Sequence, residues 1–191
     1  MRRLIYYVGA SLDGYISGPN GEVDFFPVSE VLLGFIRSEY PETIPTHLRA
    51  QMGFDAPNRR FDAVVMGRRT YDPALEVGVI SPYAHLRQYV VSSTLEETAG
   101  SGVDLIRDDP LAAVARMKQE QGLDIWLAGG GTLAGALLPQ IDELVVKRYP
   151  VVAGGGVPTF AAAFSPQAFA VAESRAIGDG TTVTTYVRVD G

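Results

Sequence analysis

The sequence contains no cysteine, and its two histidines are isolated. The absence of cysteine excludes disulfides, thiol nucleophiles and zinc sites with cysteine ligands. His47 and His85 lack the spacing of metal ligands, so we assign neither of them a role and expect no metal. The chemistry of this chain must therefore rest on other residues or on a bound cofactor.

Positive charge and long hydrophobic runs are also scarce. The chain has 16 Lys and Arg against 22 Asp and Glu, a formal net charge of −6. This balance argues against a general binder of nucleic acids or anionic membranes, and an anionic ligand would need a local basic patch. The apolar stretch within Met1–Tyr7 is too short for a signal peptide or a membrane span, so we expect a first strand there and a cytoplasmic protein.

The remaining composition is that of an ordinary globular protein. The 191 residues are 47% hydrophobic and 20% charged, enough to build one substantial α/β domain with a buried core. No internal repeat or low-complexity linker interrupts the chain. We therefore expect a single domain over residues 1–191.

Short apolar runs rich in valine and isoleucine predict strands that are covered on both faces, with helical patterns between them. The helix with the clearest ends is predicted over Asp109–Gln121, where Pro110 occupies the first turn and Gly122 follows the end. Gly178–Gly180 predicts a hairpin between the last two strands. The expected α/β fold has three layers, with a mostly parallel central sheet of about eight strands and a C-terminal antiparallel hairpin. The strands are expected at Arg3–Gly9, Ala63–Met66, Gln88–Val91, Val103–Arg107, Ile125–Ala128, Glu143–Val152, Phe169–Ile177 and Thr181–Arg188, and the other helices at Val28–Arg37, Thr46–Met52, Thr70–Val77 and Leu133–Leu138.

Ligands of such sheets lie beyond the carboxyl ends of the strands, and the end of Ile125–Ala128 is a run of glycines. Gly129-Gly130-Gly131-Thr132 follows this strand and precedes a helical pattern. Glycine permits unusual backbone angles and close approach of a ligand. The start of a helix offers N–H groups and partial positive charge to an anion. The run alone fits both a phosphate or pyrophosphate cradle and a plain tight turn.

The strand predicted at Ala63–Met66 ends in Gly67-Arg68-Arg69-Thr70. Two arginines at the start of a helix oppose the helix dipole, which favours anions there. A bound phosphate would resolve this conflict because arginine can grip it in bidentate fashion. The alternative is that both arginines are solvated or paired with nearby acids.

A third strand end, after Gln88–Val91, carries the hydroxyl cluster Ser92-Ser93-Thr94. Alone it fits a polar loop equally well. The three ends belong to one predicted sheet, however, and the carboxyl ends of parallel strands share one edge. Together they predict a groove for an extended, multiply phosphorylated ligand such as a dinucleotide.

In this order and spacing, Gly67-Arg68-Arg69-Thr70, Ser92-Ser93 and Ala128-Gly129-Gly130-Gly131 resemble the dihydrofolate reductase superfamily. Two further segments, Ser11–Ile16 and Pro150–Pro158, resemble more specifically the reductase domain of riboflavin biosynthesis, the RibD C-terminal domain, and the stand-alone bacterial proteins built from it. The resemblance covers nearly the whole chain. It implies a dihydrofolate-reductase-like fold and a reductase most similar to 5-amino-6-(5-phosphoribosylamino)uracil reductase. We expect no deaminase half of the kind that often accompanies this domain within residues 1–191, since its zinc site needs cysteine ligands.

The resemblance also implies NADPH as the cofactor, a small-molecule substrate and, by family analogy, a homodimer. Arg68, Arg69 and Thr70 would meet the phosphates, and the two arginines would select NADPH over NADH through the adenosine 2′-phosphate. The other implied contacts are Gly67 at the same turn, Ser92 and Ser93 on the adenosine side, Ala128, Gly129, Gly130, Gly131 and Thr132 around the pyrophosphate, and Gly9, Ala10 and Ile16 beside the nicotinamide.

Hydride transfer also calls for a proton donor, typically a carboxyl whose pKa burial has raised. Asp13 and Asp24 follow the first predicted strand and are candidates, as is Glu30 early in the next helix. Asp13 can equally be a turn residue before Gly14. The predicted helix Val28–Arg37 carries no acid on its apolar run, which weakens the hypothesis of a true dihydrofolate reductase.

The segment Glu39–Arg60 is expected to shape the substrate mouth. Arg59 and Arg60 either bind a substrate phosphate or are surface charges, and we favour surface charges. Trp126 is expected in the core. The competing hypothesis is a non-catalytic nucleotide-binding protein, a sensor or interaction module, whose substrate space is filled by Phe25, Phe26 or Glu39–Arg60.

Overall fold

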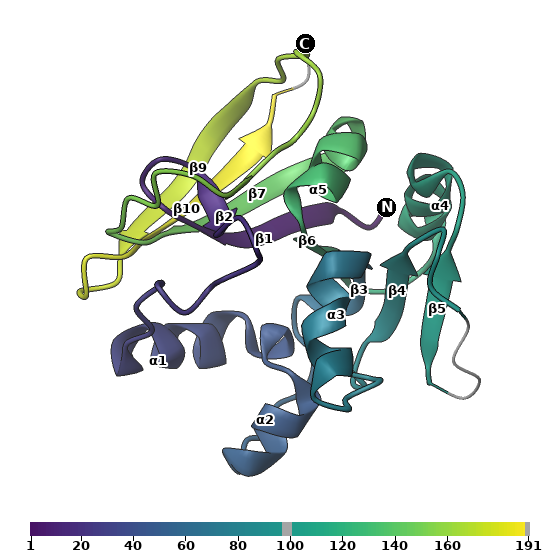
Figure 1. Ribbon diagram of the computed structural model, residues 1–191, viewed down its shortest axis with the longest axis horizontal. Helices are drawn as coiled ribbons and strands as arrows, with labels where there is room; N and C mark the ends of the chain where they lie inside the picture. Colours follow the sequence, from purple (N-terminus) through teal and green to yellow (C-terminus); the bar gives the residue numbers. More distant parts are fainter. Residues whose placement is uncertain (97–100, 190–191) are drawn as a thin grey trace.

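In residues 1–96 and 101–189, the part of the chain described by the computed structural model, eight strands form one sheet (Figure 1). The strands are β1 (Leu4–Ala10), β3 (Phe61–Gly67), β4 (Arg87–Val91), β5 (Val103–Ile106), β6 (Asp124–Gly129), β7 (Ile141–Arg148), β9 (Phe169–Ala176) and β10 (Thr182–Arg188). Their order in the sheet is β5-β4-β3-β6-β1-β7-β10-β9. The pairs from β5 to β7 are parallel, whereas β10 runs antiparallel to both β7 and β9. The predicted parallel sheet with a C-terminal hairpin is thereby confirmed.

Helices cover both faces of the sheet (Figure 1). The helices are α1 (Glu30–Glu39), α2 (Thr46–Gln51), α3 (Arg68–Glu76), α4 (Pro110–Gln119) and α5 (Gly131–Leu137), with 3₁₀ turns at Pro41–Thr43 and Leu138–Gln140. α1 begins where the Ser29 hydroxyl accepts a 3.0 Å hydrogen bond from the N–H of Leu32. α4 begins similarly, with Asp109 accepting from Ala112 at 2.9 Å. None of the helices in residues 1–96 and 101–189 has the length and apolarity needed to cross a membrane.

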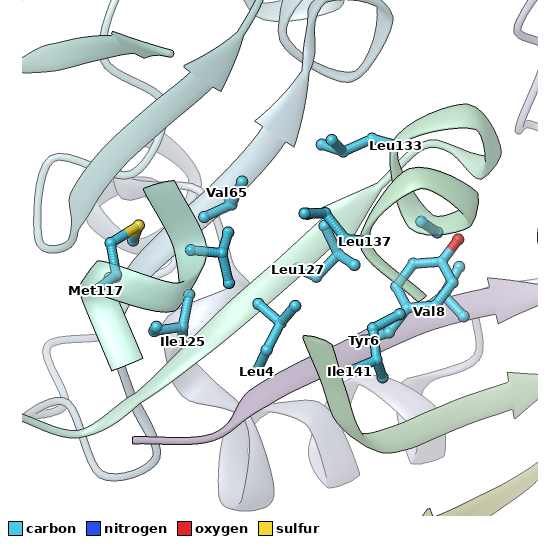
Figure 2. Close-up of a cluster of buried hydrophobic side chains, with 13 residues drawn as sticks. Leu4, Tyr6, Val8, Val65, Met117, Ile125, Leu127, Leu133, Leu137 and Ile141 are labelled. Carbon is cyan, nitrogen blue, oxygen red and sulfur yellow. The ribbon is translucent and has the colours of Figure 1, made fainter. Parts of the chain in front are cut away.

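Alternation along β1 divides the core into two clusters. Leu4, Tyr6 and Val8 point to the face covered by α4 and α5, where they meet Met117 and Leu137 (Figure 2). The intervening Ile5 and Tyr7 point to the face covered by α1 and α3. Trp126 lies in this second cluster and is only 5% exposed, which confirms its predicted place in the core. Burial on both faces explains why the sequence of β1 is a continuous apolar run.

A second, small sheet was not predicted. β2 (Tyr15–Ser17) pairs antiparallel with β8 (Val157–Pro158), two segments too short to carry a periodic pattern. The N–H of Thr159 extends the pairing by donating to the carbonyl of Gly14 at 2.9 Å. This small sheet holds the chain after β1 beside the chain after β7, at the carboxyl edge of the parallel strands.

Several predicted boundaries were displaced by two to four residues, and two of them concern the carboxyl edge of the sheet. β7 ends at Arg148, four residues before the predicted end, and the N–H of Val151 donates to the carbonyl of Tyr149 at 2.8 Å instead of to a neighbouring strand. Pro150 has no N–H to donate to the sheet, which explains the early end. α3 begins at Arg68, two residues earlier than predicted, so both arginines lie in its first turn.

Candidate functional site

The carboxyl ends of β3 and β6 lie side by side and bring the predicted site residues together. A Cβ built on Gly67 would lie 3.5 Å from the carbonyl oxygen of Gly129. A Cβ built on Gly130 would lie 3.7 Å from Cδ1 of Ile16 and 3.9 Å from the hydroxyl oxygen of Thr70. Residues from β2, the start of α3 and the end of β6 therefore converge around the bare backbone of Gly130.

The three glycines after Ala128 have different surroundings. Gly129 has a φ of +104°, which only glycine adopts readily, and a cis peptide bond joins it to Gly130. Gly131 opens α5, and any side chain there would collide with the carbonyl of Pro158. Its own carbonyl accepts a 3.0 Å hydrogen bond from Ala161. Packing thus explains Gly131, whereas Gly130 is partly exposed and Thr132 is exposed in the first turn of α5.

The N-terminus of α3 has no side-chain cap, because Gly67 occupies the N-cap position. Arg68 forms an ion pair with Asp72 one turn later, so it is held along the helix. Arg69 and Thr70 are exposed, and no carboxylate in the described residues forms an ion pair with Arg69. An anion placed here would meet the N–H groups of the first turn and the Arg69 guanidinium.

The end of β4 is more structural than predicted. Ser92 is 8% exposed, and its hydroxyl accepts hydrogen bonds from the N–H groups of Thr94 at 3.3 Å and Leu95 at 3.0 Å. Ser93 is exposed. Arg107 is exposed directly after β5, whose last residue Ile106 accepts a bond from the N–H of Ser92 at 3.1 Å. The sequence analysis did not single out Arg107 because it counted this residue as the last residue of the predicted strand Val103–Arg107.

At the end of β1, aromatic side chains surround Gly9, while Ala10 is buried with 2% exposure. A Cβ on Gly9 would come within 2.8 Å of the Tyr149 ring. The ring centre of Phe26 lies 4.6 Å from that of Tyr149, and Phe25 lies 4.3 Å from Phe26. The space expected beside the nicotinamide is therefore bounded by an aromatic row from the segment before α1.

Lys147 of β7 lies in register with Gly9 and was not a predicted site residue. Its ammonium lies 4.1 Å from the centre of the Tyr7 ring, and the side chain is half-buried. Burial lowers the pKa of Lys147 to about 8. The sequence signal was weak, because a single lysine in an apolar strand does not show what lies next to it.

Asp13 has a different role from the one considered for it. Its carboxylate accepts hydrogen bonds from the Ser11 hydroxyl at 2.6 Å and from the N–H groups of Ala153 at 3.0 Å and Gly154 at 2.7 Å. These bonds, the one from Ser11 first, lower the pKa of Asp13 to about 2. A proton donor needs the opposite shift. Asp13 therefore lies in the turn before Gly14, as the alternative stated, and its carboxylate also anchors the distant turn at Gly154, which the sequence did not predict.

The other two acidic candidates are also poorly placed for proton donation. Asp24 is exposed in the segment between β2 and α1, and Glu30 is exposed in the first turn of α1. Neither carboxyl is buried, as the proton donor of a dry site would be. The structure thus brings Gly67, Thr70 and Gly130 together but does not place a candidate carboxyl donor with them.

Most of the segment Glu39–Arg60 packs away from this site, and only Tyr40 reaches it, stacking on Tyr7 with the ring centres 4.4 Å apart. The carbonyl of Glu42 contacts His85 just before β4, and Thr46 donates from its N–H to the carbonyl of Pro82, so the segment packs where the parallel strands begin. Arg60 is also not a simple surface charge, because it pairs with the buried Glu143 at 2.7 Å. The expectation that this segment shapes the substrate mouth is therefore not supported.

A hollow of about 420 Å³ lies on the face of the sheet that α1 covers, and it reaches Val183, the register partner of Lys147. It separates the C-terminal half of α1 from the β9–β10 hairpin, with Arg60, Arg175 and Val183 in its wall. A shallower one of about 620 Å³ lies near Arg3 and Asp124, at the opposite edge of the sheet. Neither contains a residue that was predicted to bind the cofactor.

Comparisons with known proteins agree with this geometry. The model of the RibD C-terminal domain family matches residues 2–183. The uncharacterized protein YwjB of Bacillus subtilis (strain 168) is 29% identical over 161 residues, which are 83% of each chain. A crystal structure from Shewanella sp. PV-4, of a protein whose name assigns it provisionally to riboflavin biosynthesis, covers both chains completely at 29% identity and a TM-score of 0.72.

Dihydrofolate reductase from Enterococcus faecalis, complexed with NADP(H) and RAB-propyl, shares the fold at 16% identity. The TM-score is 0.65, with 98% of this chain and 97% of that chain covered. The predicted resemblance and the dihydrofolate-reductase-like fold are both confirmed. The comparisons therefore show the RibD C-terminal domain family and a reductase-like fold.

Proposed function

We propose, because this chain belongs to the RibD C-terminal domain family, that it is an NADPH-dependent reductase. It transfers a hydride to a small heterocyclic or carbonyl-type substrate, with 5-amino-6-(5-phosphoribosylamino)uracil reductase as the most similar activity. The observation that carries this proposal is the convergence of Ile16, Thr70 and the backbone of Gly130 at one strand edge. A cytoplasmic location is part of the same proposal.

The residues present fit a dinucleotide phosphate. A side chain at Gly130 would fill the space between Ile16 and Thr70, so the bare backbone there leaves room for a ligand. Arg69 and the first-turn N–H groups of α3 would hold phosphate oxygens, and Arg69 is the better placed arginine because Asp72 already engages Arg68. NADPH would supply the hydride when bound. The protein's own part is to orient the ring near Gly9 and exclude water.

Titration calorimetry with NADPH and NADH tests this proposal. We expect the wild type to bind NADPH more tightly than NADH. Arg69→Ala should weaken NADPH binding about 10- to 100-fold, because one charge-assisted hydrogen bond contributes about 1.5–3 kcal/mol. Arg116→Ala is the matched control, since Arg116 is exposed in the last turn of α4 and, like Arg69, forms no ion pair in the described residues. Absence of binding by both cofactors would refute the reductase.

One observation favours the non-catalytic alternative. The Phe26–Tyr149 pair lies against Gly9, where the nicotinamide is expected, and so takes up space on the substrate side. A binding module would bind NADPH with unchanged affinity in Phe26→Ala. In a reductase whose nicotinamide ring stacks on these aromatic side chains, the same variant would bind NADPH more weakly or would admit the substrate more readily. Folate reduction itself is less supported, because Asp24 and Glu30 are both exposed.

We also propose a homodimer. β9 is the edge strand of the sheet, and all its residues after Phe169 are exposed. An exposed edge strand offers unpaired backbone groups to another strand. The neighbouring Glu173 and Arg175 would be mutually complementary in an antiparallel pairing of two copies. Light scattering on the wild type and on Ser174→Pro, which interrupts the edge, tests this arrangement.

A further inference from the structure

The chain has only two lysines, Lys118 and Lys147, and its other 14 cationic side chains are arginines. Lys118 is 9% exposed, and its surroundings explain it. Its ammonium donates to the carbonyl of Gln140 at 3.0 Å and forms an ion pair with Asp142 at 2.7 Å. A buried lysine with such partners is an ordinary structural cation.

Lys147 has no such partners. No carboxylate in residues 1–96 and 101–189 lies within ion-pairing distance of its ammonium, which instead faces the Tyr7 ring at 4.1 Å. A ring face compensates the lost hydration of a cation only in part, and the pKa of about 8, lowered by burial, reflects this. The folded protein therefore holds an incompletely compensated cation.

The position of Lys147 is specific. Its register partners are Gly9 on β1 and Val183 on β10, so it lies at the carboxyl edge of the sheet, beside the strand end expected to meet the nicotinamide. Two residues later, Tyr149 packs on Phe26. Lys147 and the aromatic ring of Tyr149 thus lie beside Gly9, the one residue of β1 without a side chain.

We propose that Lys147 binds the substrate of the proposed reductase through an anionic oxygen on a planar, conjugated compound. The oxygen would supply the negative charge that the protein does not provide. The aromatic faces favour a flat partner. The lysine ammonium is a compact point charge, so it suits a single anionic oxygen better than it suits a phosphate, which the arginine fork binds in bidentate fashion. This inference rests on the proposed function, because Gly9 is placed beside the cofactor only there.

Lys147 is the group in this cluster that titrates near neutral pH. Burial raises the pKa of Tyr7 and of Tyr149, so both stay neutral. Asp179 acts on Tyr149 from the β9–β10 turn, but hydrogen bonds from Ser29 and Thr181 lower its pKa and keep it ionised. Val183 of β10 and Phe35 of α1, which pack on the same face, do not titrate.

Benzoate and its neutral isostere benzamide are suitable probes, titrated calorimetrically into the full chain with and without saturating NADPH. We expect the wild type at pH 7 to prefer benzoate over benzamide by at least about tenfold. Lys147→Met should abolish the preference without changing benzamide or NADPH affinity, and Lys147→Arg should retain part of it. The preference should also decline above pH 8 as the ammonium loses its proton. Lys118→Met is the matched control and should keep the preference.

Equal binding of the two probes, no benzoate binding by the wild type, or an unchanged preference in Lys147→Met would each overturn the assignment. The free energy of unfolding provides a check independent of ligands. Because the folded pKa is depressed, the stability of the wild type should rise between about pH 8 and pH 10.4, and Lys147→Met should lack this rise. If NADPH fails to bind but the benzoate preference holds, the reductase is refuted and the Lys147 site stands. If NADPH binds but the benzoate preference is missing, the Lys147 site is refuted and the reductase proposal stands.

Discussion

The two edges of the parallel sheet differ in whether their charged side chains form ion pairs. Where the strands begin, acids and bases from different strands and from the end of α4 are paired: Arg2 with Asp62 and Glu120, Arg3 with Asp124 and Glu143, Arg60 with Glu143, Arg87 with Asp62 and Glu120, and Lys118 with Asp142. Where the strands end, four cations have no ion pair within residues 1–96 and 101–189, namely Arg69, Arg107, Lys147 and Arg148.

This contrast separates stability from ligand binding. Paired charges at the first edge satisfy one another and leave nothing for a ligand. Unpaired cations at the second edge, near the partly exposed backbone of Gly67 and Gly130, keep their interactions available in a protein whose net charge is −6. The difference matches the general rule that ligands of open α/β sheets bind beyond the carboxyl ends of the strands.

The largest effect on stability is expected at the first edge, from Glu143→Ala. Glu143 is 3% exposed and pairs with Arg3 at 2.8 Å and Arg60 at 2.7 Å. Removing it leaves the half-buried Arg60 without its partner, which should lower the free energy of unfolding by about 3–5 kcal/mol. Urea denaturation measures this loss, and NADPH affinity of the folded protein should not change.

The control for Glu143 is Glu173→Ala, which removes an acid from the exposed pair with Arg175. Exposed pairs contribute about 0–1 kcal/mol, so this variant should unfold almost as the wild type does. Equal losses in the two variants would contradict the view that the first edge is a stability network.

A smaller loss is expected from Gly131→Ala at the second edge. The new methyl group would meet the carbonyl of Pro158, and overpacking of this kind costs about 1–3 kcal/mol. Gly155→Ala is matched to it, because no atom lies within 4 Å of a Cβ at that position. A neutral Gly131→Ala would mean that this glycine is kept for the ligand and not for packing.

The sequence was a good guide to the sheet and a poor guide to the contacts around the site. Strands buried on both faces are continuous apolar runs, so all eight strands of the large sheet could be located from their composition. The pairing of β2 with β8 could not, because strands of two and three residues have no period. Asp13 was misjudged for a related reason, since its partners lie about 140 residues later in the chain.

The same limit applies to the charged residues. The order of Arg68 and Arg69 after β3 placed both at the start of a helix, but only the structure shows that Asp72 engages the first of them. Lys147 and Lys118 both stand in or beside apolar stretches. Their difference lies in the neighbouring strands, which no local pattern reports.

Arg69→Ala should change stability by no more than about 0.5 kcal/mol while weakening NADPH binding, because the side chain is exposed and has no ion pair among the described residues. This variant is the counterpart of Glu143→Ala. Glu143→Ala should lose stability and keep NADPH binding, whereas Arg69→Ala should keep stability and lose NADPH binding. Thermal unfolding with and without NADPH distinguishes them on the same samples. A large loss of stability in Arg69→Ala would show that the second edge is also a stability network.

The smallest effect is expected from Asp13→Asn and depends on pH. Hydrogen bonds lower the folded pKa of Asp13 to about 2, below its ordinary value of about 3.9. The ionised carboxylate therefore stabilises the fold above about pH 4, and this contribution is lost as the pH falls through 2. Asparagine keeps one oxygen for the N–H groups of Ala153 and Gly154 but no charge. The difference in Tm from the wild type should be constant between pH 5 and 8 and shrink towards pH 2. A difference that persists at pH 2 would show that shape, and not charge, anchors this turn.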